Sequence, residues 1–224
     1  MISEKLRERL EAKGVRMHAN DHIGDHLTKY ELIALQEEVE QRVAALLDSL
    51  LIDRASDHNS KDTHRRVAKM FMQEVFAGRY ADKPAVTEFP NVSQLDQLYV
   101  VGPISVRSAC SHHLVPILGS AWVGVIPGEN VIGLSKFGRI AEWIMARPQI
   151  QEEATVMLAD EIEALCKPLG LGVVVKAAHM CCSWRGLKDN SEMTTSVMRG
   201  VLRDDPAARS EFLTFIGGHR FTCR

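Results

Sequence analysis

The sequence has no excess of one charge and no long apolar run. Its 27 Lys and Arg residues nearly balance 29 Asp and Glu residues, for a formal net charge of −2, so no basic field favours a nucleic acid partner. Apolar runs fall far short of the roughly 20 residues that a transmembrane helix needs. The charged segment 1–14 lacks the apolar core of a secretory signal. We therefore expect a cytoplasmic protein with no nucleic acid partner and no membrane partner.

Cysteine is scarce, and its distribution argues against a disulfide framework. The 5 cysteines are an odd number, and two of them, Cys181 and Cys182, are adjacent. A reducing compartment is the simpler interpretation, and there a cysteine near histidines more often indicates metal binding or catalysis. We expect Cys182 to be a packed neighbour of Cys181, and we expect Cys166 and Cys223 to be inert.

The N-terminal part of the chain predicts helices. Apolar residues recur at three- and four-residue steps from Leu32 to Leu50, and the pattern repeats from Val67 to Val75, with Gly78 as a helix stop. Residues 79–94 contain two prolines and predict a connecting loop. The expected division of the chain is a variable N-terminal extension (1–27), an N-terminal helical region (28–96) and a C-terminal domain (97–224).

The C-terminal domain predicts an α+β fold. Helical periodicity covers residues 135–170, where Pro148 suits the start of a second helix, and Asp205 suits the N-cap of a closing helix. β-Branched and aromatic residues indicate four strands, at 97–108, 117–127, 171–182 and 185–202. The expected order is therefore β-β-α-α-β-β, followed by a helix.

Two cysteines and two histidines stand near the ends of predicted strands. Cys110 and His113 form a C-x-x-H pair after the first strand, and His179 and Cys181 form an H-x-C pair at the end of the third. Alternate residues of a strand share a face, so we expect His179 and Cys181 to point into one site. Thiolate and imidazole are ligands that suit Zn²⁺. The spacing therefore predicts a zinc site.

Two arrangements of this zinc site remain open. If Cys110, His113 and Cys181 bind the ion, one coordination position is open, as in catalytic sites. His112 and His179 are then free to move protons beside the ion. If both residue pairs bind the ion in full, the site is closed and structural.

A second group of residues suits an anionic nucleotide. Lys136 and Arg139 lie one helical turn apart at a predicted helix start, where backbone amides also favour phosphate. Arg185 follows the H-x-C pair, and Arg66 lies on an early helix. The carboxylate of Glu152 could accept two parallel hydrogen bonds from guanine. Cations on separate segments are also typical of solvated surface, and acidic residues are typical of helix N-termini.

Five segments together resemble GTP cyclohydrolase I. The motifs CSHHLVP, VIGLSKFGRI, RPQIQEE, HMCCSWRG and MTTSVMRG occur in the order and spacing of that family, over roughly residues 28–218. The resemblance implies that residues 97–224 are a catalytic domain with a tunnelling fold, which assembles into a multi-subunit barrel. It implies a homodecamer with active sites at subunit interfaces. The implied reaction converts GTP and water into 7,8-dihydroneopterin triphosphate and formate, the first step of folate and pterin biosynthesis.

The resemblance also implies a role for each matched residue. It assigns zinc binding to Cys110, His113 and Cys181, and acid–base catalysis to His112 and His179. It assigns substrate binding to a further set, which comprises Gln151 and Glu152 for guanine and Ser135, Lys136, Arg139, Arg185 and Arg66 for the triphosphate.

Two residues depart from the family pattern. Ser111 stands where the family usually has glutamate, and His64 stands where it commonly has proline. Loss of a carboxylate beside the zinc ligands changes the electrostatics that tune a metal. The alternative function is therefore a paralogue that releases an altered product, or one that only binds a purine or pterin nucleotide.

Three histidines of the N-terminal extension are spaced four residues apart. On a helix, His18, His22 and His26 would align and could bind a metal. The segment 17–26 is polar and contains a glycine, which favours a mobile stretch instead.

A zinc nucleobase deaminase is the nearest enzymatic rival, because it also activates water with Cys and His ligands. That class carries H-x-E followed by P-C-x-x-C. Here no glutamate follows His113 at that spacing, and the second cluster reads H-x-C-C. The products also differ, since a deaminase releases ammonia and a cyclohydrolase releases formate.

Overall fold

The computed structural model describes residues 1–217 and divides into two compact units, residues 1–82 and residues from 83 onward. Helices make up the first unit, as the apolar periodicity predicts. They are α1 (Ile2–Ala12), the short 3₁₀ helix η1 (Gly24–His26), α2 (Lys29–Ser49), α3 (Thr63–Lys69), the π-helix η2 (Met70–Val75) and α4 (Ala77–Tyr80). None of the helices in the described part of the chain combines the length and apolar character needed to cross a membrane.

The long helix α2 begins with a capping box and is tied to α1 by polar contacts. The Glu31 amide donates to Thr28 Oγ1 (3.3 Å), and the Thr28 amide donates to Glu31 Oε2 (2.8 Å). Arg9 of α1 donates to the same carboxylate at 2.5 Å. The predicted apolar stripe is only partly buried within the chain, because no residue of α2 is fully buried and Leu46 and Leu50 at its end are 58% and 61% exposed.

Two predictions near the end of the helical region are wrong. Gly78 does not stop a helix, because it lies within α4, where its carbonyl contacts His22 Nδ1 at 3.2 Å. The predicted loop contains the strand β1 (Glu88–Pro90), which pairs antiparallel with β4 (Asn130–Ile132). Pro90 stands at the end of β1, where a missing amide proton is tolerated.

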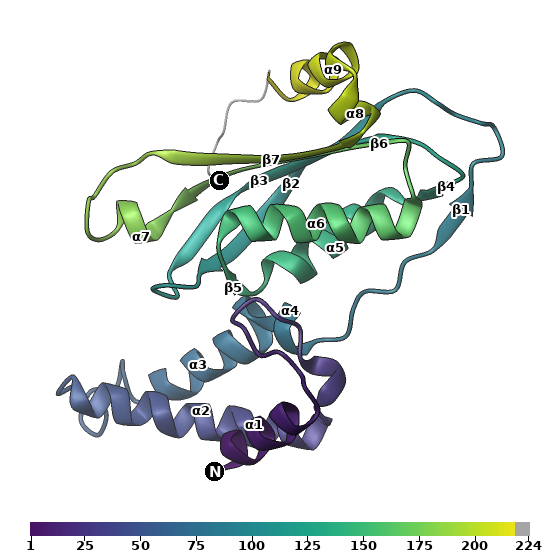
Figure 1. Cartoon of the computed structure of the whole chain (residues 1–224). Helices are drawn as coiled ribbons and strands as arrows, with labels where there is room; N and C mark the ends of the chain where they lie inside the picture. The colour runs from purple at the N-terminus through teal and green to yellow at the C-terminus, as the bar shows by residue number, and fades with distance from the viewer. Residues whose placement is uncertain (218–224) are drawn as a thin grey trace. The chain divides into compact units, whose positions relative to one another are not determined.

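A five-stranded sheet forms the frame of the second unit (Figure 1), and its order is β5-β2-β3-β6-β7. Strands β2, β3, β6 and β7 pair antiparallel, whereas β5 pairs parallel with the end of β2. The strands are β2 (Tyr99–Cys110), β3 (Pro116–Ile126), β5 (Pro148–Gln149), β6 (Gly170–His179) and β7 (Glu192–Gly200). Four of these correspond to the predicted strands, and the α+β class is confirmed.

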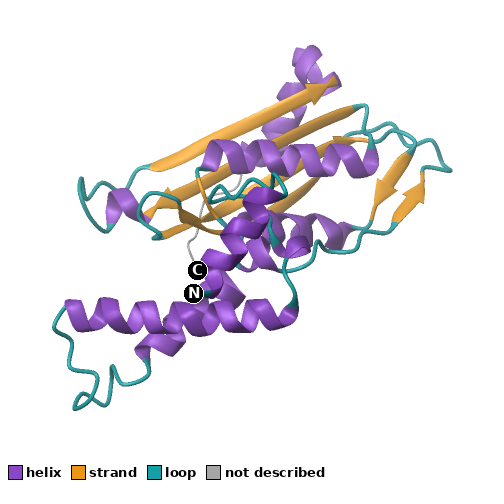
Figure 2. Cartoon of the chain, turned by 60° about the horizontal axis from the view of Figure 1, so that its bottom comes forward, coloured by secondary structure: helices purple, strands orange, loops and turns teal. Residues whose placement is uncertain are grey.

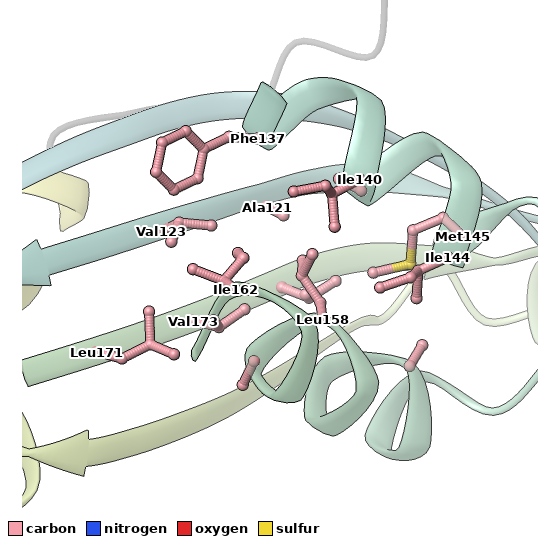
Figure 3. Packing of buried hydrophobic residues seen from close by; sticks show 14 of the residues in the cluster. Ala121, Val123, Phe137, Ile140, Ile144, Met145, Leu158, Ile162, Leu171 and Val173 are labelled. Atoms are coloured by element: carbon pink, nitrogen blue, oxygen red, sulfur yellow. The ribbon is translucent and has the colours of Figure 1, made fainter. Parts of the chain in front are cut away.

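Helices α5 (Leu134–Met145) and α6 (Gln151–Cys166) cover one face of this sheet (Figures 1 and 2). Figure 3 shows how their apolar side chains meet those of the central strands. The labelled residues come from α5 (Phe137, Ile140, Ile144, Met145), from α6 (Leu158, Ile162), from β3 (Ala121, Val123) and from β6 (Leu171, Val173). Alternation along β3 and β6 sends these residues to the helical side. This packing fixes the strand ends that carry the candidate site.

The opposite face of the sheet is covered by α8 (Val201–Asp204) and α9 (Pro206–Gly217). Phe212 of α9 is fully buried against Gly124 and Gly172. Both glycines alternate along their strands with residues that face α5 and α6, so they lie on the opposite face of the sheet. The Ala207 amide donates to Asp205 Oδ1 at 2.8 Å, so the predicted N-cap is confirmed.

Four predicted boundaries in the second unit are wrong. Pro148 lies in β5 and α6 starts at Gln151, because Pro148 and Gln149 complete the edge of β2 beside Ala109 and Cys110. The third predicted strand ends at residue 179, and the helical turn α7 (Met180–Ser183) follows. The fourth predicted strand starts at residue 192 and ends at residue 200, followed by α8.

Candidate active site

The CSHHLV segment is a tight turn between β2 and β3. The Cys110 amide donates to the Val115 carbonyl (2.9 Å), and the Leu114 amide donates to the Cys110 carbonyl (2.8 Å). Leu114 closes the turn with a φ of 55°, a left-handed conformation that is uncommon for a leucine. The turn buries Cys110, which is 4% exposed, and leaves both His112 and His113 exposed.

The sheet register brings the second residue pair to this turn. His179, the last residue of β6, lies opposite Ile117 of β3. One turn of α7 then carries Cys181 back to the β2–β3 turn, so the sulfur atoms of Cys110 and Cys181 and a ring nitrogen of His113 lie within 4.8 Å of one another. Cys181 therefore reaches the site from a helical turn and does not use strand alternation.

The donor set and its charge state suit a thiophilic cation. Two sulfurs and an imidazole nitrogen match Zn²⁺, whose ligands lie about 2.0–2.3 Å from the ion, so small side-chain adjustments suffice. Burial raises the pKa of the Cys181 thiol to about 11, together with a side-chain hydrogen bond in which Cys181 keeps its proton and donates to Cys110. A cation would reverse this effect by stabilising the thiolates. The three residues thus fit a bound zinc ion.

Two further histidines flank this Cys-His-Cys group. His112 Nδ1 lies 3.5 Å from Cys110 Sγ, and His179 Nε2 lies 2.9 Å from Gln151 Oε1. Burial lowers the pKa of His179, and the nearby Glu152 carboxylate partly opposes that effect. Within residues 1–217, the group able to hold a metal comprises three residues and excludes His179, which favours the open arrangement over the closed one.

The structure brings one of the predicted triphosphate contacts to the Cys-His-Cys group. Arg185 is exposed, and its Nη1 lies 3.2 Å from His113 Nε2. Ser135, Lys136 and Arg139 lie on the first turns of α5, where the Lys136 ammonium donates to the Ala85 carbonyl (2.8 Å). Arg66 is exposed on α3 of the first unit, and its role stays a prediction.

The two predicted guanine contacts differ sharply in their exposure. Glu152 is exposed in the first turn of α6, whereas Gln151 is 3% exposed. The Gln151 side chain is surrounded by Thr195 of β7 and by backbone carbonyls of β6 and β7. Sequence reasoning missed this environment, and Thr155 and Thr195 with it, because it depends on how β7 pairs with β6.

The remaining sequence predictions concern cysteines and N-terminal histidines. Cys182 is exposed, so its predicted packing is wrong, whereas Cys166 is buried and burial raises its thiol pKa to about 11, as suits an inert residue. Cys223 lies outside the described residues. His22 contacts Asp25 (3.1 Å) and Gly78, and the described chain has no metal-holding group at the N-terminal histidines.

In this α+β domain the Cys-His-Cys group can hold a metal ion and has two histidines beside it, and three-residue donor sets of this kind are typical of catalytic zinc sites. Comparison with known proteins identifies the family. Residues 39–217 match the family model for GTP cyclohydrolase I. The chain belongs to the GTP cyclohydrolase I family, whose members are hydrolases that act on GTP, and the predicted resemblance is confirmed.

Similar proteins include several that carry the name GTP cyclohydrolase 1. That of Shewanella amazonensis is 37% identical over 180 residues, which is 80% of this chain and 83% of that protein. That of Aliivibrio salmonicida is 37% identical over 183 residues (81% and 84%), and that of Vibrio cholerae is 36% identical over 180 residues (80% and 82%). Among solved structures, the apo archaeosine synthase QueF-Like overlaps 53% of this chain and 97% of its own, at a TM-score of 0.37 and 17% identity.

Proposed function

We propose that this chain is a zinc-dependent GTP cyclohydrolase I, which converts GTP and water into 7,8-dihydroneopterin triphosphate and formate at the start of folate or pterin synthesis. Family membership supports the substrate. The observation that carries the proposal is the convergence of Cys110, His113 and Cys181 within 4.8 Å, with His112 and His179 beside them.

In this proposal Cys110, His113 and Cys181 hold Zn²⁺. His112 and His179 beside them transfer protons. The bound ion supplies Lewis-acid chemistry that activates water near neutral pH. A histidine of the pair His112 and His179 donates a proton to N7 of the purine, which makes C8 more electrophilic and favours opening of the imidazole ring. Imidazole suits this task because its pKa lies near working pH.

Substrate binding in this proposal depends on exposed charged residues of the second unit. The Glu152 carboxylate accepts hydrogen bonds from N1–H and the amino group of guanine, and its exposure leaves it available for that contact. Arg185 holds the triphosphate near His113, which it already contacts. Ser135, Lys136 and Arg139 complete the triphosphate site with the amides at the start of α5.

The proposed assembly is a homo-oligomer, a decamer with active sites at subunit interfaces. The five-stranded sheet ends at β5 and β7, and the outer edge of β7 can pair with a strand of a neighbouring subunit. Repeated around a ring of subunits, such pairing closes open sheets into a barrel. The division of the chain into a variable extension (1–27), an N-terminal helical region (28–96) and a catalytic domain (97–224) belongs to the same proposal.

Incubation of the zinc-loaded protein with GTP tests the proposed reaction. We expect a product with the mass of 7,8-dihydroneopterin triphosphate and one equivalent of formate. Release of ammonia without formate would instead identify a deaminase. Tight nucleotide binding without any product would identify the non-catalytic alternative, and a different product mass would identify a paralogue altered by residues such as Ser111.

The variant His179→Ala tests the acid–base assignment within that reaction. Loss of a positioned proton carrier lowers turnover by about 10²- to 10⁴-fold. We expect GTP to bind the variant with nearly unchanged affinity, measured by calorimetry, because the guanine and triphosphate contacts remain. Turnover that survives the substitution would show that His179 does not carry the proton.

A further inference from the structure

Gln151 makes all of its side-chain hydrogen bonds inside the protein. Its amide nitrogen Nε2, which carries two hydrogens, lies within hydrogen-bond distance of three acceptors, the carbonyls of Val175 (3.0 Å) and Met193 (3.1 Å) and Thr195 Oγ1 (3.0 Å). Its oxygen Oε1 lies 2.9 Å from His179 Nε2. With 3% of its surface exposed, this side chain has little left to offer a substrate.

These contacts fix which end of the Gln151 amide faces the histidine. Backbone carbonyls only accept hydrogen bonds, so the atom that faces Val175 and Met193 is the NH₂ group. The oxygen therefore faces His179, and an amide oxygen also only accepts. His179 Nε2 must then carry a hydrogen, and in the neutral ring Nδ1 is the nitrogen with the free lone pair.

Two threonines lock the Gln151 amide in this orientation. Thr155 Oγ1 donates its one proton to the backbone carbonyl of Gln151 at 2.7 Å. In the contact between Thr155 and Thr195 (2.7 Å), Thr195 must therefore be the donor, which leaves its oxygen to accept from Gln151 Nε2. Each hydroxyl proton has one place to go, and a network satisfied in this way resists rearrangement.

We propose that Gln151 is a positioning residue whose Oε1 accepts a hydrogen bond from His179 Nε2, which holds the ring in the Nε2–H tautomer and leaves the Nδ1 lone pair free. Among residues 1–217, the bond to Gln151 is the one hydrogen bond that the His179 ring makes, so Nδ1 stays available. The catalytic use of that nitrogen rests on the proposed function, whereas the tautomer does not. In this proposal Glu152 alone binds guanine, and Gln151 does not have the guanine-binding role that the sequence predicted for it.

The tautomer can be measured without substrate. Solid-state ¹⁵N NMR of the zinc-loaded full chain with ¹⁵N-labelled histidine separates protonated from unprotonated ring nitrogens, and the His179→Ala variant identifies the relevant signals. We expect Nε2 of His179 to be protonated and Nδ1 to be unprotonated above the pKa of the ring. An Nδ1–H tautomer in the wild-type protein would overturn the proposal.

Two variants extend the test to activity with a matched control. Gln151→Leu removes the acceptor, and we expect kcat to fall about 10- to 100-fold while KM changes little. Gln149→Leu is the control, because Gln149 is equally buried (2% exposed) and donates to Ser108 and to two carbonyls but contacts no histidine. Equal losses of kcat in both variants would mean that burial alone matters, and the proposal would fail.

A gentler substitution tests the orientation of the amide without changing Gln151. Thr195→Val removes one acceptor and keeps the side-chain shape, but the Val175 and Met193 carbonyls still face the NH₂ group, so we expect the Nε2–H tautomer of His179 to persist. Loss of that tautomer in Thr195→Val would overturn the proposal, and Thr195→Ser should match the wild type. If formate release from GTP is absent in the wild type, the proposed function fails while the tautomer measurement still decides this proposal.

Discussion

At the scale of single residues, two adjacent cysteines have different surroundings. Cys181 contributes a sulfur to the group with Cys110 and His113, whereas Cys182 is exposed on α7 and outside that group. Both belong to the same helical turn, so a substitution at either position disturbs the backbone to a similar extent. Comparing substitutions at Cys181 and Cys182 therefore distinguishes the loss of a metal ligand from damage to the local backbone.

Replacing each cysteine by serine tests the metal assignment. Cys181→Ser removes a thiolate ligand, and we expect the zinc content of the purified protein to fall from near one ion per chain to a small fraction, with loss of turnover. Cys182→Ser should keep both zinc and turnover. Zinc is measured by mass spectrometry of the acid-digested protein. Equal zinc in the two variants would contradict the assignment.

The chemistry of the site could be predicted from the sequence, but its geometry only in part. The C-x-x-H and H-x-C spacings predicted a zinc site, but on their own they left open whether three or four of these residues bind the ion. The surroundings of Gln151 could not be foreseen, since they depend on the register that places Thr195 opposite Val175. Register between strands far apart in the sequence is set by packing of the whole sheet.

At the scale of elements, long periodic segments were predicted well and short ones were not. The two-residue strand β5 forms because the edge of β2 offers hydrogen-bond partners, and β1 forms because it pairs with the equally short β4, so their own propensity contributes little. The turn α7 was missed for a similar reason, because the apolar segment before it predicts a strand that continues. Pairing, rather than local sequence, ends β6.

Close packing of α9 on the sheet yields a stability prediction. A Cβ added at Gly172 would lie 2.7 Å from Phe212 Cε1, so we expect Gly172→Ala to destabilise the protein by about 1–3 kcal/mol. Gly138 of α5 has no atom within 4 Å of that position, so Gly138→Ala should stabilise the helix by about 0.5–1 kcal/mol. Urea unfolding measures both, and a stable Gly172→Ala variant would contradict the packing.

The junction of α1 and α2 predicts a pH-dependent contribution to stability. The Arg9 guanidinium lowers the pKa of Glu31 from its ordinary 4.5 to about 2, with help from the Thr28 amide. A lowered folded-state pKa stabilises the protein above the unfolded-state pKa, and this contribution is lost as pH falls from 4.5 toward 2.

Glu31→Gln isolates that charge, because glutamine also serves in a capping box. We expect the variant to be less stable than the wild type at neutral pH, and the difference to shrink below pH 4.5. Glu37→Gln, at an exposed position on the same helix, should give a small difference at every pH. Urea unfolding across this pH range is the measurement, and a pH-independent deficit at Glu31 would contradict the ion pair.

At the scale of the whole molecule, the exposed apolar residues of α2 fit the proposed assembly. A helix whose stripe is only partly buried in its own chain gains stability when another copy covers it. For a decamer we expect a mass about ten times the 25.0 kDa chain, measured by light scattering. Leu46→Glu should lower that mass, whereas Glu37→Gln should not. A wild-type monomer at micromolar concentration would contradict the proposed assembly.

The central claim is that one zinc ion is held by Cys110, His113 and Cys181 with a coordination position left open. Anomalous X-ray diffraction at the zinc edge, from crystals of the zinc-loaded protein, tests it most directly. The account predicts one peak per chain within bonding distance of these three side chains and of no fourth protein ligand. A peak that is missing, or one that His179 also ligates, would contradict it.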